Sequence, residues 1–596
     1  MRTLSLLMGS TLLASMGIAD QAMAQAAASP TDVTEVVVTG SRVKKDAFNA
    51  PEPILVITAE SAKLAGYADT ASMLQRPSIA AGSFQTNGQL TGYVVTGGPG
   101  AQTLNLRRLG AQRTIVLMDG KRLGPAGVGG TVGPVDLNVV PQSIIDKIEV
   151  LKDGASSIYG SDAVAGVVNI ITKKKHDGAN FDAYASGSQG AGGNSYLMSG
   201  DWGKTFDKGY IEVAAEYFTQ ESLTRGQRDY TNCNEDYLFN PTTGARVDFG
   251  ADPATYNYGH QYKCYNLTSN DIATAANGTL QYVRPGVVYP TSAQGNNVPT
   301  TVSAALGGPL NTIFARQARA GYPATYPYAN YSTPFTNRAS IVSPDRHYNL
   351  SANVGYDLDA SAHLYAQFQY SERLSFQTGA RQLFPTLGST WKASNPNNVF
   401  AGTGVSAVYP IIARPSDYRQ DVKYTRAVAG IKGDFRNLGW FNRFSYDAYA
   451  VYSRSDADYQ NDSIYNDRVV ASTTGAAACN PLTPNLSNFS CAALGTNGIP
   501  WLSQRVVSGQ FTQDETNFLF FKAHGTTQYD QIILESDFTG DLINLPAGPL
   551  GSAFGVSYRH DRISDTPDKQ AQLGNLWGQT AAGHTAGTDG VGEAYL

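Results

Sequence analysis

The chain has 596 residues, a net charge of −5 and 16% charged residues, and it contains 61 glycines and 34 tyrosines. Low charge with abundant glycine and tyrosine is not typical of a soluble α-helical enzyme and favours many strands joined by turns. The longest basic run is Lys173-Lys174-Lys175, so we expect no nucleic-acid partner. The sequence shows neither a catalytic nucleophile arrangement nor a metal-ligand spacing, and we expect no enzymatic activity, no cofactor and no metal site.

Residues 1–24 predict a secretory signal peptide. Arg2 supplies a positive start, Leu4–Ile18 is an apolar run, and Ala22-Met23-Ala24 has the small residues of a cleavage site. Glycine and serine interrupt the apolar run, which argues against a membrane anchor. No later segment reaches the about eighteen consecutive apolar residues of a membrane helix, so a membrane-spanning chain would have to form a closed barrel.

The four cysteines could pair in three ways. Cys233 with Cys264, and Cys479 with Cys491, are each local pairs in polar, turn-rich stretches. We predict these two disulfides, which the oxidising environment of an exported protein permits. A zinc site is not indicated, because no CxxC motif or histidine cluster accompanies any cysteine.

An N-terminal segment, residues 25–45, follows the signal peptide and contains EVVVTGSR at 35–42. Its three consecutive valines favour extended backbone, and Gly40 with Ser41 ends the run. No partner strand is close in sequence, so the segment could add to a sheet edge of another protein. The alternative is that residues 35–42 belong to a mobile N-terminal tail that pairs with no other protein.

Residues 46–175 predict a small α+β domain. We expect a strand at 54–57, followed by two short helices whose N-termini are capped by Thr58 and Asp69. The apolar positions expected to face the core on these helices are Leu64, Ala71 and Leu74.

The clearest hairpin of the chain lies at 113–123, with Asp119-Gly120 as a two-residue turn of the primed type. We also expect strands at 104–110, 147–152 and 167–172, and a short helix starting at Pro141. Two glycine-rich loops, 83–102 and 124–134, lie between these elements. The second lacks the Gly-Lys-Ser/Thr ending of a phosphate loop, so nucleotide binding is not expected.

Three motifs in order carry a resemblance to a known family: EVVVTGSR, NLRRLGAQRTIVLMDGKRL and VPQSIIDKIEVLKDGASSIYGSDAVAGVVNIITKK. They resemble the plug domain of TonB-dependent outer-membrane receptors over about residues 30–175. The resemblance implies a TonB box that pairs with the periplasmic protein TonB, and through it with ExbB–ExbD. The residues of that box would be Glu35, Val36, Val37, Val38, Thr39 and Gly40.

The same resemblance places ligand-contacting loops at 83–102 and 124–134. Within the first loop the candidate ligand-binding residues are Gln85, Asn87, Gln89 and Tyr93.

Residues 176–596 predict an antiparallel transmembrane β-barrel with long loops. In GYIEVAAEYFTQ at 209–220, Glu212 and Glu216 share one face and apolar residues occupy the other, as a lumen and a lipid surface require. The alternative is a soluble β-sandwich. Similar alternating runs occur at 346–358, 361–375, 421–435, 440–455, 528–540 and 552–563.

We expect about nine or ten strands in this half, whereas barrels of the family have about 22. The chain ends at 593–596 in what resembles the opening of a strand, without the terminal aromatic residue that family members usually carry. We therefore expect a C-terminally truncated fragment with roughly the first half to two thirds of the barrel.

A long insertion at 222–344 is rich in tyrosine. Aromatic faces stack on planar or sugar ligands, so these residues are ligand-binding candidates, although tyrosines packing loop against loop is the alternative. They are Tyr322, Tyr326, Tyr328 and Tyr331.

Arg107 and Arg108 are candidate plug–barrel contacts. In the strand expected at 104–110 they would face opposite sides, and a buried arginine needs a carboxylate partner. Glu212 or Glu216 could supply it from the barrel wall. The alternative is that both arginines face water in the gap between plug and barrel.

The resemblance implies an active transporter in the outer membrane of a Gram-negative bacterium, with plug and TonB box facing the periplasm. It would import a scarce small ligand, an iron–siderophore complex or another metal chelate, with energy from the inner-membrane proton gradient. Outer-membrane lipid and lipopolysaccharide would surround it. The open alternatives are a ligand-sensing signal-transducing receptor, or an importer of an oligosaccharide, haem, cobalamin or an aromatic compound.

Overall fold

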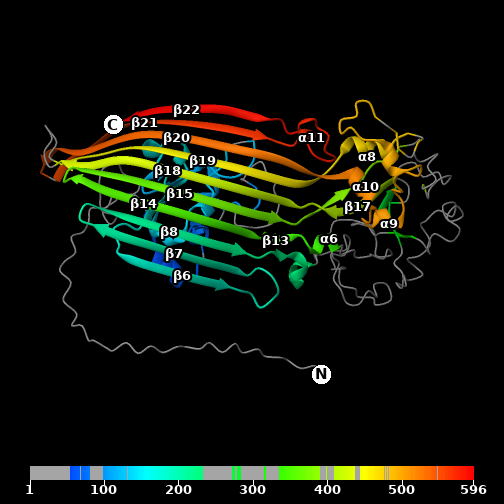
Figure 1. Ribbon diagram of the computed structural model, residues 1–596, viewed down its shortest axis with the longest axis horizontal. Coiled ribbons are helices and arrows are strands. Elements are labelled where there is room, and N and C mark those ends of the chain that lie inside the picture. The colour runs from blue at the N-terminus through cyan, green and yellow to red at the C-terminus, as the bar shows by residue number, and fades with distance from the viewer. Residues whose placement is uncertain are drawn as a thin grey trace, which may run out of the picture.

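The chain folds into a small N-terminal domain, a long curved sheet and a module at one end of that sheet (Figure 1). The computed structural model describes residues 54–67, 69–80, 83, 98–130, 132–232, 271–274, 278–282, 314–316, 334–388, 398, 408–435, 443–475, 477, 479–480, 482–546 and 548–596.

The N-terminal domain, residues 54–175, is built on a five-stranded sheet in the order β1-β4-β5-β2-β3. Neighbouring strands are antiparallel except β2 and β5, which run parallel. One short helix, α3 (Ser156–Tyr159), precedes β5. The strands are β1 (Ile54–Thr58), β2 (Thr114–Met118), β3 (Lys121–Arg122), β4 (Ile145–Leu151) and β5 (Gly166–Thr172).

Two capped helices follow β1, as the sequence predicts. The side chain of Thr58 caps α1 (Ala59–Leu64), and that of Asp69 caps α2 (Thr70–Gln75), each by accepting a hydrogen bond from a backbone N–H of the first turn. These bonds satisfy donors that have no partner inside a helix.

The apolar face expected on these helices is only partly correct. Ala71 and Leu74 of α2 are buried in the domain core, whereas Leu64 of α1 is 84% exposed. Ala62 is the buried residue of α1 instead. A helix of six residues presents little more than one position to the core, and the register of its cap decides which one.

The predicted hairpin turn at Asp119-Gly120 is confirmed. Both residues have positive φ, 50° and 79°, as a primed two-residue turn requires, and Met118 pairs with Lys121 across it.

The strand expected at 104–110 is wrong. Residues Leu106–Arg108 form a 3₁₀ turn in which Arg107 and Arg108 both have positive φ, 53° and 58°. Left-handed backbone cannot continue a strand. The Asn105 side chain accepts a hydrogen bond from the backbone N–H of Gly110 at 2.7 Å and so closes this turn. The helix expected from Pro141 is likewise a single 3₁₀ turn, after which β4 begins at Ile145.

The large sheet has ten strands in the order β22-β21-β20-β19-β18-β15-β14-β8-β7-β6, and all neighbours are antiparallel. The ten strands are β6 (Gly178–Ser186), β7 (Ser195–Phe206), β8 (Gly209–Gln220), β14 (Asp345–Asp359), β15 (Ala362–Gln377), β18 (Tyr418–Phe435), β19 (Phe444–Ile464), β20 (Phe520–Leu545), β21 (Gly548–Thr566) and β22 (Thr585–Tyr595). The alternating runs of the sequence predicted seven of them, β8, β14, β15, β18, β19, β20 and β21, and these are confirmed. The runs did not locate β6, β7 and β22.

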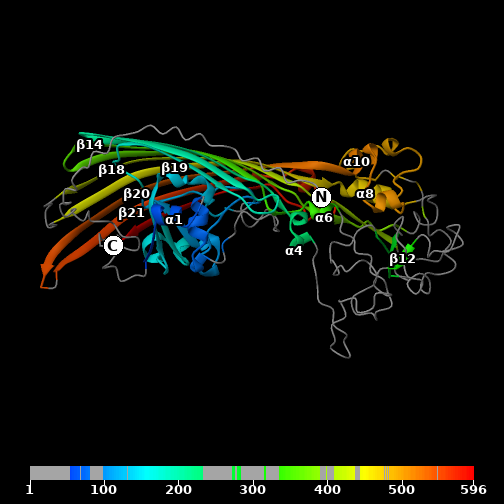
Figure 2. The same cartoon turned by 90° about the horizontal axis from the view of Figure 1, so that it is seen from below.

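The two faces of the large sheet differ in polarity. In β14 the buried Asp345, His347 and Asn349 alternate with the exposed Tyr348 and Leu350. The sheet is curved, and the N-terminal domain lies against its concave side (Figure 2). The polar face is therefore the one that meets the N-terminal domain. Among the helices that the structure describes, none has the length and apolar character needed to cross a membrane.

The module at one end of the large sheet, here called the distal module, combines a second five-stranded sheet with short helices (Figure 1). Its strands, in the order β12-β11-β10-β17-β16, are β10 (Asp271–Thr274), β11 (Gly278–Tyr282), β12 (Phe314–Arg316), β16 (Ala380–Leu383) and β17 (Val408–Pro415). The helices are α8 (Asn466–Thr473), α9 (Gln504–Val507) and α10 (Gln513–Leu519).

The distal module has its own apolar core. Trp501 is completely buried there, and its indole N–H donates to the Ser472 carbonyl at 3.1 Å. The predicted disulfide between Cys479 and Cys491 is confirmed and ties the loop after α8. Further short elements lie between consecutive strands of the large sheet. They are β9 (Leu223–Thr224), α4 (Asp229–Asn232), α6 (Pro334–Asn337), β13 (Ser340–Val342) and α11 (Lys569–Gln572).

Candidate functional site

The interface between the N-terminal domain and the large sheet contains many buried polar contacts, and we treat it as the candidate functional site. One glycine-rich loop of the domain approaches the sheet wall with its backbone. The N–H groups of Gly124, Gly127 and Gly129 donate to hydroxyl groups of the wall at 3.2–3.4 Å. A Cβ added at Gly124 would lie 2.2 Å from the Ser453 hydroxyl oxygen, so glycine permits this close approach.

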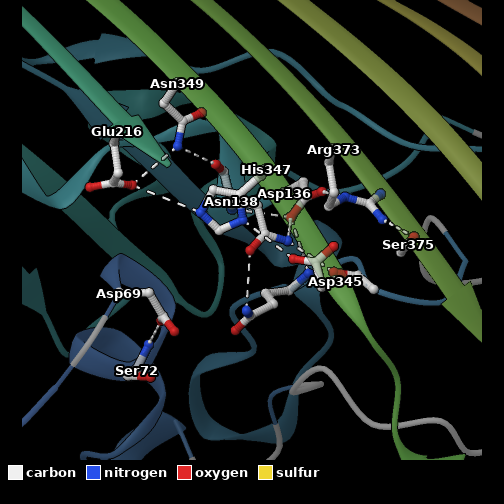
Figure 3. Close-up of polar contacts among 12 residues, drawn as sticks. Asp69, Ser72, Asp136, Asn138, Glu216, Asp345, His347, Asn349, Arg373 and Ser375 are labelled. Carbon is white, nitrogen blue, oxygen red and sulfur yellow. Dashed lines mark hydrogen bonds and ion pairs between the residues drawn. The ribbon is translucent and has the colours of Figure 1, made fainter. Parts of the chain in front are cut away.

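Asp136 organises the loop that enters the interface (Figure 3). One carboxylate oxygen, Oδ1, accepts hydrogen bonds from the backbone N–H of Gln102 at 3.0 Å and from the side chain of Asn138 at 2.8 Å. The other, Oδ2, accepts from Arg373 Nε of β15 at 2.8 Å. Asp136 is 1% exposed and Arg373 is 2% exposed, so this ion pair is shielded from water.

Arg373 uses its remaining donors on a second loop of the N-terminal domain and on the sheet wall. Its Nη1 donates to the Pro99 carbonyl at 3.1 Å and to the Ser375 hydroxyl at 2.6 Å, and Nη2 donates to Gln420 Oε1 at 3.3 Å. A planar guanidinium with several satisfied donors fixes the orientation of both partners. This side chain therefore holds two loops of the N-terminal domain against the sheet.

A second buried cluster surrounds Glu216 of β8. Its carboxylate accepts the backbone N–H of Gln142 at 2.8 Å and the Asn349 amide at 3.2 Å, while Asn349 also donates to the Asn138 carbonyl at 3.1 Å. His347 lies between Glu216 and Asp345, 3.8 Å and 3.3 Å from their carboxylates (Figure 3). Charged and amide groups of the sheet thus bind backbone groups of the domain.

The hairpin of the N-terminal domain supplies further contacts. Gln367 of β15 donates to Asp119 at 2.6 Å, and Lys121 lies 3.2 Å from Asp447 of β19. Burial alone would raise the pKa of Asp119, but Lys174 and hydrogen bonds from Thr172 outweigh it and hold that pKa below its ordinary value. Asp119 therefore presents a carboxylate to the sheet.

Asp162 bridges the domain and the sheet. Arg122 of β3 lies 2.6 Å and Arg559 of β21 lies 3.2 Å from the same carboxylate oxygen. Burial would raise the pKa of Asp162, but the two arginines outweigh it and lower that pKa.

In contrast, burial raises the pKa of Asp69, where the hydrogen bonds from Ser72 compensate only in part.

The two arginines predicted to contact the barrel do not fill that role. Arg107 donates to the carbonyls of Ala165 and Val164 at 3.2 Å and 2.9 Å and lies 3.8 Å from Asp153, all within the N-terminal domain. Arg108 is exposed. Because both arginines lie in a left-handed turn, their side chains do not alternate between two faces as they would in a strand. The predicted arginine–carboxylate contact exists only as the exposed pair of Arg107 with Asp153, and Glu216 binds backbone N–H instead.

Most other predicted site residues lie outside the described residues. These are the TonB box at 35–40, the ligand candidates in 85–93 and 322–331, and the disulfide of Cys233 with Cys264. Among the residues that are described, no group of three or more His, Cys, Asp or Glu is placed to hold a metal ion.

Sequence reasoning missed the two residues at the centre of the interface, Asp136 and Arg373. The available signal was the alternation in β15, where Gln369, Ser371 and Arg373 share one face. That pattern marks a polar inner wall, but it does not indicate which loop of the N-terminal domain meets it.

The comparison with family models identifies the N-terminal domain. The model described as TonB-dependent Receptor Plug Domain matches residues 46–167. This part of the chain is a plug domain. The plug domain thus sits against the concave polar face of an antiparallel sheet, held by Asp136, Glu216 and Asp162.

Solved structures with a similar arrangement include BauA, the ferric preacinetobactin receptor of Acinetobacter baumannii, with 12% identity and a TM-score of 0.40 over 93% of this chain and 62% of that one. The siderophore receptor PiuA of the same organism has 14% identity and a TM-score of 0.35, covering 91% and 61%.

A mutant of the ferric enterobactin receptor PfeA of Pseudomonas aeruginosa has 15% identity and a TM-score of 0.38, covering 92% of this chain and 54% of that one. The chain spans less than two thirds of the length of each of these receptors.

Proposed function

We propose that this chain is part of a TonB-dependent outer-membrane transporter that imports a scarce ligand, a ferric siderophore complex. The observation that carries the proposal is the plug domain seated on the polar face of the large sheet. A plug blocks passive diffusion, so a protein that carries one needs an energy source to admit its ligand. The residues Glu35–Gly40 would pair as a strand with TonB, and the proton gradient would supply the energy through ExbB–ExbD.

The chemistry of the interface supports a plug that can move. Part of the interface is apolar, because Ala214, Val422, Tyr424, Ala457 and Tyr459 of the large sheet belong to the same buried cluster as apolar residues of the plug domain. The remainder is polar and includes the ion pair of Asp136 with Arg373 and the hydrogen bond from the Gln142 N–H to Glu216. Each of these polar groups can exchange its partner for water when the plug separates, which keeps the net cost to about 1.5–3 kcal/mol for a hydrogen bond to a charged group. An equally large apolar interface would resist separation in proportion to its area.

A cleft with a mixed polar and apolar lining lies beside the plug domain. It has a volume of about 420 Å³ and runs between α1 and strands β6 and β7, lined among others by Tyr67, Lys173 and Ser199. The ion pair of Lys63 with Asp182, at 2.7 Å, crosses it. In the proposed transport cycle, movement of α1 would break this exposed pair and widen the cleft.

The proposal is tested by uptake in cells that produce the full-length receptor. Cells are offered radiolabelled iron on a panel of siderophores, with and without a protonophore. We expect one complex to be imported, and import to stop when the proton gradient collapses. Import that continues without the gradient would contradict energised transport. Uptake of an oligosaccharide, haem, cobalamin or an aromatic compound instead of every ferric complex would contradict the ligand class.

The TonB box is tested separately by Val37→Pro. Proline removes a backbone donor and does not fit a paired strand, so import should be lost while ligand still binds to the cell surface. Val37→Ile, which keeps the donor and the β-branched side chain, is the matched control and should transport normally. Normal import by Val37→Pro would refute the box.

A further inference from the structure

Two arginines of the distal module lie directly opposite each other on paired strands. Arg381 of β16 and Arg414 of β17 are register partners in an antiparallel pair. Side chains of such partners share one face of the sheet, with Cβ atoms about 4.5–5.5 Å apart, and like charges in this position destabilise the pair. Neither residue is needed for the contacts between plug and large sheet.

No carboxylate neutralises either charge in the part of the chain that the structure describes. Arg381 donates to the Trp577 carbonyl at 2.8 Å, and Arg414 donates to the Gly509 carbonyl at 2.9 Å. Arg414 Nε is buried without an acceptor. The negative charge that acts on both arginines is Asp462, whose carboxylate already lies 2.8 Å from Lys522.

Aromatic rings orient the two guanidinium groups. Arg414 lies 4.3 Å from the ring centre of Phe520 and 5.1 Å from that of Phe511, and Arg381 lies 5.9 Å from that of Trp577. Ring faces attract a cation but do not carry a compensating charge. Burial lowers the pKa of both guanidinium groups, which shows that the surroundings disfavour these positive charges.

The other arginine with bidentate contacts in this module is arranged differently. Arg505 at α9 donates through both Nη atoms to the carboxylate of Glu515, at 2.7 Å and 2.6 Å. Arg468 of α8 has no ion pair among the described residues either, but it donates to the Ser487 hydroxyl and to the carbonyls of Phe518 and Ser487. Arg381 and Arg414 differ from both of these arginines because they lie opposite each other on paired strands, and because Arg414 Nε is buried without an acceptor.

We propose that Arg381 and Arg414 form a binding site for an oxyanion, a carboxylate or phosphate group. Guanidinium groups match the geometry of both anions, and one anion between two cross-strand arginines would remove their repulsion. β17 lies beside α9 at the end of the molecule away from the plug domain (Figure 1). The site goes beyond the transport proposal, because it is a property of the distal module alone.

The test measures thermal unfolding of the purified full-length receptor in inorganic phosphate and in chloride at equal ionic strength. We expect phosphate to raise the Tm of the wild type. Arg381→Gln and Arg414→Gln should each lose this phosphate-specific rise, with about tenfold weaker phosphate binding. Without phosphate, each variant should be at least as stable as the wild type, because the repulsion is gone.

Arg505→Gln is the matched control. It removes an arginine of the same module that already has a carboxylate partner, so it should lower the Tm in both salts and keep the rise with phosphate. Equilibrium dialysis with radiolabelled phosphate gives an independent measurement for any variant with altered unfolding. Absence of phosphate-specific binding by the wild type, or unchanged binding by the double variant Arg381→Gln/Arg414→Gln, would overturn the proposal.

Discussion

The interface of the plug domain and the interior of the distal module are stabilised in opposite ways. The plug domain binds the large sheet through buried polar groups, with Asp136 and Arg373 at the centre. The distal module is held by an apolar core around Trp501 and by the disulfide of Cys479 with Cys491. Polar partners can be exchanged for water, whereas buried apolar surface and a covalent bond cannot. The contrast suits a plug that separates and a module that keeps its shape.

The largest effect should come from breaking the central ion pair of the plug interface. Asp136→Leu leaves the buried guanidinium of Arg373 without a carboxylate, which we expect to destabilise the receptor by about 3–5 kcal/mol. Denaturant unfolding of the full-length receptor measures this value. The double variant Asp136→Leu/Arg373→Met should recover most of the loss, because no charge is then left unpaired. A double variant as unstable as the single one would show that the pair is not the cause.

In the distal module, loss of the disulfide should lower the stability of that module and leave the plug domain unchanged. Cys479→Ser/Cys491→Ser opens a loop whose ends are 12 residues apart in sequence. We expect a loss of about 2–4 kcal/mol for the module, since the cross-link limits the unfolded chain. Limited proteolysis read by mass spectrometry should show faster cleavage at 474–500 and unchanged cleavage of the plug domain. Faster cleavage in both regions would mean that they are coupled.

The close approach of the plug loop to the wall should tolerate no added volume. Gly124→Ala places a methyl group 2.2 Å from the Ser453 hydroxyl, and we expect destabilisation by about 1–3 kcal/mol. Gly133→Ala in the same loop is the matched control, because nothing lies within 4 Å of its added Cβ. Equal stability of the two variants in thermal unfolding would contradict the tight contact.

Local patterns predicted regular parts of the large sheet and of the plug domain. Alternation located strands such as β8 and β14, because a sheet with one polar and one apolar face imposes a period of two on its sequence. The Asp119-Gly120 turn followed from residue types that accept positive φ. Each of these signals lies within a few consecutive residues.

The candidate site could not be predicted, because its residues are distant in sequence and its backbone is irregular. Asp136 and Arg373 are 237 positions apart, and no local pattern links them. Arg107 has alternating neighbours typical of a strand, yet its left-handed conformation is fixed by hydrogen bonds to Val164 and Ala165. Tertiary contacts decided both cases.

The smallest effect concerns the bridge made by Asp162 and depends on pH. Arg122 and Arg559 hold the pKa of Asp162 below its ordinary value of 3.8 despite burial. A carboxyl group with a lowered pKa in the folded state adds stability above its unfolded pKa, and this stability is lost as the pH falls through the folded value. The wild type should therefore be more stable than Asp162→Asn at neutral pH, and the difference should shrink below pH 3.8.

Variants of the two arginines that contact Asp162 can show whether the plug domain or the large sheet supplies this stability. Arg122→Gln removes the contact within the plug domain, whereas Arg559→Gln removes the contact with the large sheet. If Asp162 helps to hold the plug in place, Arg559→Gln should reduce the pH dependence of plug protection against proteolysis. A pH dependence that survives Arg559→Gln and disappears in Arg122→Gln would assign Asp162 to the plug alone. The polar contacts between plug and sheet would then be those of Asp136 and Glu216. The contrast with the apolar core of the distal module would depend on these two residues.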